Sequence, residues 1–498
     1  MIIHKFGGTS VGNAARLSGV ADIVCERQRG FDGTVEAANV IVVSAAEGVT
    51  DLLIAGARAA AEGEDTVYRE IKAELLARHL EIVDVLLEDS RERLSVGGLI
   101  EDRLHELGRL YRSIAVLGEL TARGGDAVAS FGEHLSVHIL AAVLRERGAR
   151  ARAISSTELI VTDDHFGAAS PLMELTRRNL GQRIDPLLER GVLPVVTGYV
   201  GATEDGATTT LGRGGSDFAA AVIGVGLDAD EIWIWSDVDG ILTADPNIVP
   251  QARTLTELSY TEASELAYVG AEVLHPRTIR PLVRRGIPLR IVNSFNPTHP
   301  GTAIVERPTA GRAVLPAIIS ATGLSMIAVG SQDDSWTLDL AARALRELSQ
   351  VGLEVLMFSQ SLSEHNLNLV VRESDQDHCL KILSREFKDC HVEDAFRLGV
   401  QEKVATISVV ALPGWNGGPN GIVSRAFSAL GERQTRVIAV AQAGTERSVS
   451  FCIPEDQLTD AVVFLHRKLG LGDGPLAGAQ PAVGPLGNDA AAPAPYLG

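Results

Sequence analysis

Short runs of β-branched residues alternate with helix-like stretches over the first 307 residues of the chain. Parallel strands need long crossover connections, so this rhythm predicts a three-layer α/β unit with a mostly parallel sheet covered by helices on both faces. The chain has 498 residues, which leaves room for further domains. The expected strands are Ile2-Ile3, Asn39–Ser44, Ala151–Ile154, Leu193–Tyr199, Glu231–Trp235 and Leu289–Asn293.

Two segments depart from this rhythm. Between about residues 66 and 120 the apolar residues take helical spacing among many charges, which predicts a helical insertion with a packing or lid role and no assigned chemistry. Around Arg307–Pro316 the periodicity lapses, as in a linker.

A β-α-β-β pattern then occurs twice, over residues 318–371 and again over 405–453. This repeat predicts two copies of a small ferredoxin-like unit after the α/β unit. The last residues are rich in Gly, Ala and Pro, which favours disorder. The expected divisions are 1–307 for the α/β domain, 308–317 for the linker, 318–396 and 403–470 for the two small domains, and 471–498 for the tail.

Composition excludes several partners. The formal net charge of −19 argues against nucleic acid. Four scattered cysteines show no metal-ligand spacing, so no metal-ligating residue is assigned and reduced thiols are expected. No signal peptide opens the chain, and no apolar run reaches the roughly 18 residues that span a bilayer. These features predict a cytoplasmic protein without a membrane partner.

The first expected strand runs into a glycine-rich loop, Lys5–Val11 (Lys-Phe-Gly-Gly-Thr-Ser-Val). Glycines let the backbone approach a phosphate closely, hydroxyls add donors, and Lys5 supplies a mobile positive charge. The loop is not of the Walker type, because no Gly-x-x-x-x-Gly-Lys-Ser/Thr pattern is present. The alternative is an ordinary tight turn.

A second glycine-rich loop, Thr208–Asp217, precedes a helix start and predicts an anion site at the helix N-terminus. The planar fork of Arg213 suits a carboxylate, and Asp217 suits an ammonium group. Together they would recognise an α-amino acid. The alternative for Asp217 is an N-terminal cap of the helix.

Three further segments agree with a ligand site. Residues 44–51, which include Thr50, follow an expected strand, where open α/β sheets bind ligands. Glu133 lies at a helix start, where a solvated surface charge is the alternative. Residues 234–246 place Ser236 and Asp237 after a strand, as in a nucleotide loop, although Asp-rich turns with Gly and Pro are also simply turns.

These motifs, together with Gly270–Ile279, resemble those of the aspartate kinases of the amino-acid kinase superfamily, in the same order. The repeat resembles the tandem ACT domains of those enzymes, in particular the kinase half of bifunctional aspartate kinase–homoserine dehydrogenases. No dehydrogenase follows here, so a monofunctional chain is expected.

The resemblance implies transfer of the γ-phosphoryl group of Mg-ATP to the side-chain carboxylate of L-aspartate, giving 4-phospho-L-aspartate for lysine, threonine and methionine biosynthesis. The nucleophile is already ionised, so no general base is needed. The implied catalytic residues are Lys5, Gly7, Gly8 and Asp217, and the aspartate-binding residues are Thr50, Glu133, Arg213 and Asp217. The implied ATP-binding residues are Lys5, Gly8, Thr9, Ser10, Ser236, Asp237, Leu242, Asn247 and Glu272.

Two of these positions depart from the family pattern. Many members have lysine where this chain has Glu272, and an arginine often stands at the position of Asn247. Two cationic contacts to the triphosphate are therefore absent. ATP would be held mainly by Lys5, Mg²⁺ and backbone amides, or be bound weakly; a third alternative is an inactive or catalytically weak amino-acid sensor.

The resemblance also implies feedback inhibition by an amino acid at ACT interfaces between subunits of a homodimer or higher homo-oligomer. Threonine is preferred over lysine, on the basis of Gln360 and the likeness to the bifunctional class. The alternative is that the repeats serve only as a dimer platform. The implied effector-binding residues are Gln360, Ser363, Glu364, Asn366 and Gln442.

Overall fold

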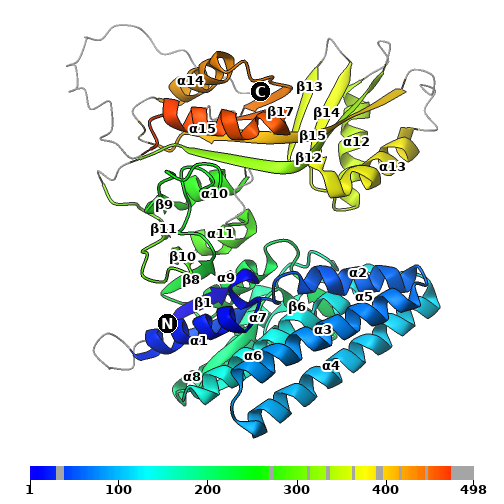
Figure 1. Ribbon diagram of the computed structural model, residues 1–498, viewed down its shortest axis with the longest axis vertical. Helices are drawn as coiled ribbons and strands as arrows, with labels where there is room; N and C mark the ends of the chain where they lie inside the picture. The colour runs from blue at the N-terminus through cyan, green and yellow to red at the C-terminus, as the bar shows by residue number, and fades with distance from the viewer. Residues whose placement is uncertain are drawn as a thin grey trace.

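The computed structural model describes residues 1–29, 39–268, 274–310, 314–331, 337–361, 365–387, 396–413, 415, 418–442 and 447–472. It contains an α/β unit formed by residues 1–305, here the N-terminal unit, and a second unit formed by residues 317–472, here the C-terminal unit. In Figure 1 the C-terminal unit lies above the N-terminal unit.

The N-terminal unit is built on one sheet in the order β3-β5-β2-β1-β8-β10-β11-β9. All neighbours are parallel except β10 and β11, so the predicted parallel sheet is confirmed. β1 and β2 are central, and their carboxyl ends point to the same edge. The strands are β1 (Ile2–Phe6), β2 (Asn39–Val43), β3 (Ala151–Ile154), β5 (Leu193–Thr197), β8 (Glu231–Ser236), β9 (Glu257–Ser259), β10 (Leu289–Asn293) and β11 (Thr302–Val305).

Successive side chains of the central strands enter two separate cores. Val40 and Val42 of β2 pack with α9 on one face, whereas Ile41 and Val43 pack with α1, α2 and α6 on the other. This confirms helices on both faces, since period-2 alternation of apolar residues needs two apolar cores here. The helices are α1 (Ala14–Arg29), α2 (Val49–Ala61), α3 (Asp65–Leu86), α4 (Ser90–Leu117), α5 (Ala122–Ala129), α6 (Phe131–Glu146), α7 (Met173–Arg183), α8 (Asp185–Glu189), α9 (Gly215–Gly226), α10 (Tyr260–Tyr268) and α11 (Pro276–Val283).

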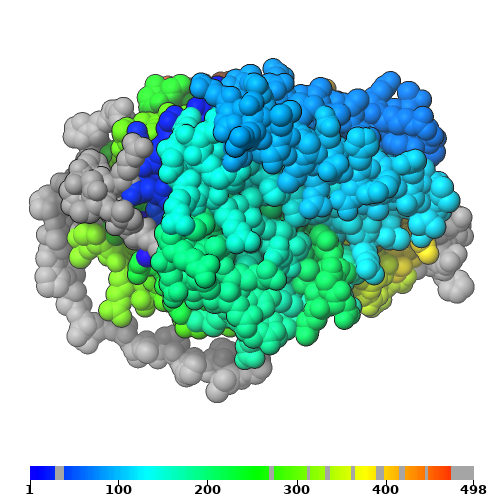
Figure 2. All heavy atoms as spheres, turned by 90° about the horizontal axis from the view of Figure 1, so that it is seen from below, coloured from blue at the N-terminus to red at the C-terminus, as the bar shows by residue number. Residues whose placement is uncertain are grey.

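The predicted helical insertion is confirmed as the long pair α3 and α4, which pack on α2. Tyr111 of α4 is fully buried, and its hydroxyl donates a hydrogen bond to the Leu53 carbonyl oxygen of α2 at 2.9 Å. Seen from the end opposite the C-terminal unit, the insertion covers one side of the surface (blue in Figure 2). One stretch, Ala122–Glu146, is apolar and long enough to cross a membrane, but its most apolar window is 83% buried inside the protein, as in a core helix.

The C-terminal unit has one sheet in the order β13-β14-β12-β15-β17-β16. The β-α-β-β pattern occurs twice, as predicted. The elements are β12 (Ala317–Ser331), α12 (Leu338–Gln350), β13 (Met357–Ser361), β14 (Asn366–Arg372), α13 (Gln376–Phe387), β15 (Phe396–Val410), α14 (Gly418–Glu432), β16 (Ala439–Gln442), β17 (Ser448–Pro454) and α15 (Leu458–Lys468).

The long strand β12 contributes to both copies. The second half of β12, from Leu324, pairs with β14 of the first copy, whereas its first half, Ala317–Ala321, pairs with the end of β15 that also pairs with β17. The second copy is thus completed by a strand that precedes the first copy along the chain. The boundaries 318–396 and 403–470 remain a prediction, and the sheet itself is continuous across them.

Some local expectations differ from the structure. The strand expected over Leu193–Tyr199 ends at Thr197, because Tyr199 adopts a left-handed backbone with φ of 63° that a strand cannot contain. A small sheet of β4 (Val161–Thr162), β6 (Val200–Thr203) and β7 (Thr208–Thr210) was not predicted, since strands this short carry no periodicity. Residues 307–310 and 314–316 have no helix or strand, as expected of a linker; residues 473–498 lie outside the described ranges.

Candidate active site

The two loops that follow β1 and β2 are packed backbone to backbone. The Glu47 N–H donates to the Gly8 carbonyl oxygen at 3.2 Å and joins the two loops, while the Gly7 N–H ties the first loop to β8 through the Trp235 carbonyl oxygen at 3.2 Å. A Cβ on Gly8 would lie 3.0 Å from the Ala45 carbonyl oxygen, closer than side chains normally come. Glycine at this position therefore allows the two loops to meet.

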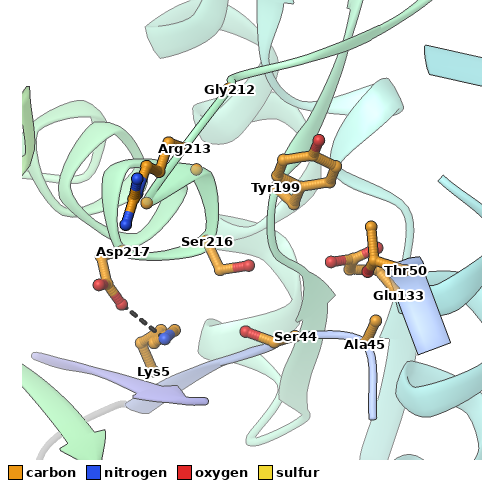
Figure 3. Close-up of a pocket in the computed structure, with 12 residues that line it drawn as sticks. Lys5, Ser44, Ala45, Thr50, Glu133, Tyr199, Gly212, Arg213, Ser216 and Asp217 are labelled. Atoms are coloured by element: carbon orange, nitrogen blue, oxygen red, sulfur yellow. Dashed lines mark ion pairs between the residues drawn. The ribbon is translucent and has the colours of Figure 1, made fainter. Parts of the chain in front are cut away.

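A cleft of about 300 Å³, a size suited to a small ligand, opens beside Lys5 of β1 and the loop after β2 (Figure 3). Five residues that the sequence analysis implicated separately are brought together there: Lys5, Thr50, Glu133, Arg213 and Asp217. The other residues that line the cleft are Ser44, Ala45, Tyr199, Gly212, Gly214, Gly215 and Ser216.

Lys5 and Asp217 form an ion pair across the cleft. Lys5 Nζ lies 2.6 Å from Asp217 Oδ1, and the two side chains are only 10% and 15% exposed. Asp217 belongs to the first turn of α9, whose N-cap is Gly214 with φ of 67°. The interpretation of Asp217 as the helix cap is therefore wrong, and its carboxylate is directed at Lys5 instead.

Glu133 is buried in the cleft wall and is only 3% exposed, so the alternative of a solvated surface charge is wrong. Its carboxyl accepts a hydrogen bond from the Ala45 N–H, but Oε2 has no hydrogen-bond partner among the described residues. Burial raises the pKa of Glu133 to about 8, against the opposing effects of the Ala45 N–H and of the positive charge of Lys5. Such a carboxylate is poised to receive a cation.

Two residues of the site were missed by sequence reasoning. Asp126 is 4% exposed, and its carboxylate accepts hydrogen bonds from the Gly167 N–H, from the Thr210 N–H at 2.9 Å and from the Thr210 hydroxyl at 2.6 Å. Tyr199 is hydrogen-bonded to the same Thr210 side chain, and burial raises its pKa. Together they fix the start of the second glycine loop. No motif marks either residue, because their partners are distant in sequence.

Tyr199 also explains why residue 215 of that loop is a glycine. A Cβ on Gly215 would lie 2.6 Å from the Tyr199 ring, so only glycine lets the first residue of α9 pack against it. The ring borders the cleft between the Glu133 side and the Arg213 side (Figure 3).

Arg213 reaches out of the N-terminal unit. Its Nη1 lies 2.7 Å from Oε2 of Glu354, which belongs to the C-terminal unit, and both side chains are about half exposed. Figure 3 shows Arg213 on the same side of the cleft as Asp217, away from Glu133 and Thr50.

The residues expected to bind nucleotide lie outside the cleft lining, around the carboxyl end of β8. Ser236 ends β8, and its hydroxyl donates to Asp237 Oδ1 at 3.1 Å. Asn247 is exposed, and its N–H donates to Asp245 Oδ1. Leu242 is half-buried in the same loop, and Thr9 is half-buried after β1. Glu272 lies outside the described residues.

One expected nucleotide contact needs correction. Ser10 is fully buried, and its Oγ lies 2.8 Å from Ser294 Oγ, while Ser294 also donates to the Ser236 carbonyl oxygen at 3.0 Å. The Ser10 hydroxyl therefore ties the loop after β1 to the end of β8, and this bond occupies the group that was expected to contact the nucleotide.

Two of the expected effector residues, Gln360 and Gln442, lie on the edges of the C-terminal sheet. Gln360 is in edge strand β13, next to the start of β14 at Asn366, and Gln442 ends the opposite edge strand β16. These two edge strands also approach each other. Ser363 and Glu364 lie outside the described residues.

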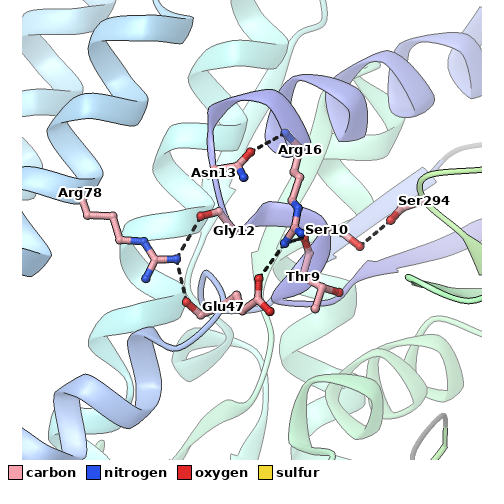
Figure 4. A network of polar contacts seen from close by, with 8 residues as sticks. All are labelled: Thr9, Ser10, Gly12, Asn13, Arg16, Glu47, Arg78 and Ser294. Carbon is pink, nitrogen blue, oxygen red and sulfur yellow. Dashed lines mark hydrogen bonds and ion pairs between the residues drawn. The ribbon is translucent and has the colours of Figure 1, made fainter. Parts of the chain in front are cut away.

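An arginine of the helical insertion joins the two loops that border the cleft (Figure 4). Arg78 of α3 donates through Nη2 to the Gly12 carbonyl oxygen at 3.0 Å and to the Glu47 carbonyl oxygen at 2.7 Å. Arg16 adds a second tie, from Nη1 to the Thr9 carbonyl oxygen at 3.1 Å and to Glu47 Oε2 at 2.7 Å. The insertion was expected to have a packing or lid role without assigned chemistry, and Arg78 shows that it also holds the two loops together.

Comparison with known proteins gives a consistent result along the chain. The amino acid kinase family matches residues 1–293, and the ACT domain matches residues 336–387 and 418–469. Aspartokinase 1, chloroplastic, of Arabidopsis thaliana is 33% identical over 475 residues, which cover 93% of this chain and 79% of that protein. A bifunctional aspartokinase/homoserine dehydrogenase of Daucus carota is 31% identical over 494 residues, covering 94% of this chain and 50% of that protein.

Solved structures agree with these matches. E. coli aspartokinase III in complex with aspartate and ADP superimposes with a TM-score of 0.77 at 27% identity, covering 94% of this chain and all of the other. The same enzyme with lysine and aspartate gives a TM-score of 0.73 at 26% identity, covering 94% of this chain and 99% of the other.

The position of Arg78 predicts a role in turnover. Arg78→Gln removes both hydrogen bonds between α3 and the loops, so we expect kcat to fall on the order of tenfold, because small misplacements of bound groups slow a reaction strongly. Both bonds come from the single nitrogen Nη2, and Arg78→Lys keeps one cationic donor nitrogen on a shorter side chain, so it should recover part of the loss. Steady-state kinetics measures both.

Arg69→Gln is the matched control, since Arg69 lies on the same helix in an exposed ion pair with Asp65. It should leave kcat unchanged. A lower melting temperature for Arg78→Gln with unchanged kcat would show that Arg78 contributes only to stability.

Proposed function

The chain belongs to the amino acid kinase family and is an aspartate kinase with ACT domains, and on that premise we propose which residues of the cleft act on each substrate. The enzyme transfers the γ-phosphoryl group of ATP to the side-chain carboxylate of L-aspartate. The observation that carries the proposal is the distribution of charge in the cleft: a buried carboxylate with an unpartnered oxygen at Glu133, and an ion pair between Lys5 and Asp217.

We assign aspartate binding to Thr50, Glu133, Arg213 and Asp217. An ammonium group supplies the cation that Glu133 lacks, and Asp217 offers a second carboxylate to it. The guanidinium of Arg213 takes a carboxylate of the substrate through its planar fork. The Thr50 hydroxyl provides a neutral donor on the Glu133 side of the cleft. The E. coli enzyme whose structure superimposes on this chain binds aspartate and ADP, which supports an amino acid and a nucleotide as the two ligands.

Phosphoryl transfer requires two anions to meet, so positive charge is the main need of the site. Lys5 is assigned to the transferring phosphoryl group, next to the backbone of Gly7 and Gly8. In the structure Lys5 is held by Asp217. When the substrate ammonium pairs with the Asp217 carboxylate, Lys5 loses its ion pair with Asp217 and can pair with the phosphoryl oxygens instead. The attacking carboxylate needs no base, because it is already ionised.

ATP is assigned to the loop after β1 and to the loop after β8, through Gly8, Thr9, Ser236, Asp237, Leu242 and Asn247. Among the described residues no group of three or more His, Cys, Asp and Glu could cage a metal ion. This fits Mg²⁺, which proteins commonly hold by one or two carboxylates together with phosphates and water. Asp217 would offer an oxygen to the ion, and the ion would supply positive charge to the phosphates.

We assign an amino-acid effector to the turn between β13 and β14, with Gln360 and Asn366, and to Gln442 in the second copy. Threonine is the proposed effector. Lysine is the alternative, and it is the ligand in the E. coli structure that superimposes with a TM-score of 0.73. Pairing of C-terminal units would give a homodimer, which remains a proposal.

The first prediction concerns Lys5. Lys5→Met should lower kcat about 10²- to 10³-fold, because one preorganised charge at the reacting group is lost, and should change the KM for aspartate much less. The assay contains ATP, aspartate and hydroxylamine, which traps the acyl phosphate as a hydroxamate. Lys381→Met, an exposed lysine on α13, is the control and should behave as wild type.

Unchanged kcat in Lys5→Met would remove this residue from the mechanism. No hydroxamate from wild-type enzyme with aspartate would support the sensor alternative, and product with glutamate instead would change the substrate.

The second prediction follows from the raised pKa of Glu133. Only the ionised carboxylate attracts the substrate ammonium, so kcat/KM for aspartate should fall as the pH drops below about 8. The slope should approach tenfold per pH unit, since ionised Glu133 becomes rarer by that factor. Tyr199 stays neutral in this window, because burial raises its pKa.

Glu133→Gln should lower kcat/KM for aspartate and flatten its profile between about pH 6 and 8, since no charge is left to titrate. Persistence of the same acid limb in Glu133→Gln would assign that ionisation to another group.

The third prediction concerns regulation. Threonine should inhibit the kinase, and Gln360→Ala should weaken the inhibition while leaving kcat unchanged, because Gln360 lies outside the cleft. Inhibition by lysine instead of threonine would reassign the effector. No response to either amino acid would leave the C-terminal units as a dimer platform.

A further inference from the structure

One carboxylate of the C-terminal unit touches the active-site cleft. Glu354 lies in the segment between α12 and β13, and its Oε2 accepts a hydrogen bond from Arg213 Nη1 at 2.7 Å. Arg213 is one of the residues that line the cleft. The contact therefore joins the C-terminal unit directly to a proposed substrate-binding side chain.

The same carboxylate faces a second arginine, in its own unit. Glu354 Oε2 lies 3.7 Å from Nε of Arg372, the last residue of β14. Glu354 thus stands between an arginine of the cleft and an arginine of the C-terminal sheet, and it is closer to the first. The imidazole of His275, which packs on Gly214, is influenced by the charges of both Glu354 and Arg213.

We propose that Glu354 sets the affinity of the active site for aspartate by occupying Arg213 with a carboxylate that the substrate must displace. The inference rests on the proposed function, in which Arg213 receives a carboxylate of aspartate. Glu354 has the same reactive group as the substrate, so the two compete for one guanidinium.

The exposure of the pair suits a reversible contact. The side chains of Arg213 and Glu354 are 51% and 47% exposed, so water screens the attraction and the pair can be opened by a competing anion. A fully buried pair would be too costly to separate.

Arg372 offers the Glu354 carboxylate a second partner, as an alternative to Arg213. A shift of the C-terminal sheet that brings Glu354 closer to Arg372 would withdraw it from Arg213 and raise the affinity for aspartate. A shift in the other direction would lower the affinity. An amino acid bound in the C-terminal unit could act on the cleft by biasing these two positions.

The test is a set of kinetic measurements on full-length variants. Glu354→Gln preserves the shape of the side chain and removes its charge, so the KM for aspartate should fall about two- to fivefold, the range that exposed ion pairs allow. The KM for ATP and kcat should not change. Glu347→Gln is the matched control, since Glu347 is on the neighbouring helix α12 and pairs with Arg346.

A second variant gives the opposite sign. Arg372→Gln removes the competing arginine and leaves Glu354 to Arg213 alone, so the KM for aspartate should rise. The double variant Glu354→Gln/Arg372→Gln should behave as Glu354→Gln. General damage to the fold would not produce two effects of opposite sign that depend on each other in this way.

Arg213→Gln separates the inference from the proposed function. If Arg213→Gln raises the KM for aspartate while Glu354→Gln leaves it unchanged or raises it, competition by Glu354 is wrong and the role of Arg213 stands. If Arg213→Gln leaves the KM for aspartate unchanged, Arg213 does not bind the substrate, and the inference fails with that assignment.

Discussion

The ion pair between Lys5 and Asp217 is the interaction around which the active site is arranged. It joins the central strand β1 to the first turn of α9 at a distance of 2.6 Å, and both side chains are largely shielded from solvent. A shielded lysine needs a counter-charge. Asp217 supplies it in the structure, and in the proposed reaction the phosphoryl group would take over that role. The pair thus holds in place the lysine that we propose acts on the phosphoryl group.

The C-terminal unit contacts both sides of this site. On the side proposed for aspartate Glu354 meets Arg213, and the loop after β8, proposed for the nucleotide, is tied through Thr243. The Thr243 carbonyl oxygen accepts the Ile318 N–H at 2.8 Å, and its hydroxyl lies 3.1 Å from His466 Nε2 in a buried contact. Burial lowers the pKa of His466 and so favours the neutral ring, whose tautomer decides which of the two groups donates. Movement of the C-terminal sheet can therefore reach both substrate sites through polar contacts.

Features encoded locally could be predicted from the sequence. The strand β10 follows directly from the β-branched pair Ile291 and Val292, and Lys5, Glu133 and Asp217 were found because each lies in a compact motif. Contacts between distant segments could not be predicted. Arg78 and Asp126 hydrogen-bond to loops far along the chain, and no sequence motif in either partner segment indicates these contacts. The same holds for the pairing of the first half of β12 with β15 in the C-terminal sheet. Burial of Glu133, which decides its chemistry, also depends on the assembled fold.

A structure determined with aspartate and a non-hydrolysable ATP analogue tests this account most directly, through the distances from Lys5 Nζ to Asp217 and from Arg213 to Glu354. The account predicts that Lys5 leaves Asp217 for the terminal phosphate, that the substrate ammonium lies against Glu133 and Asp217, and that Arg213 exchanges Glu354 for a substrate carboxylate. A complex in which Lys5 remains at 2.6 Å from Asp217, with aspartate bound away from Glu133, would contradict it.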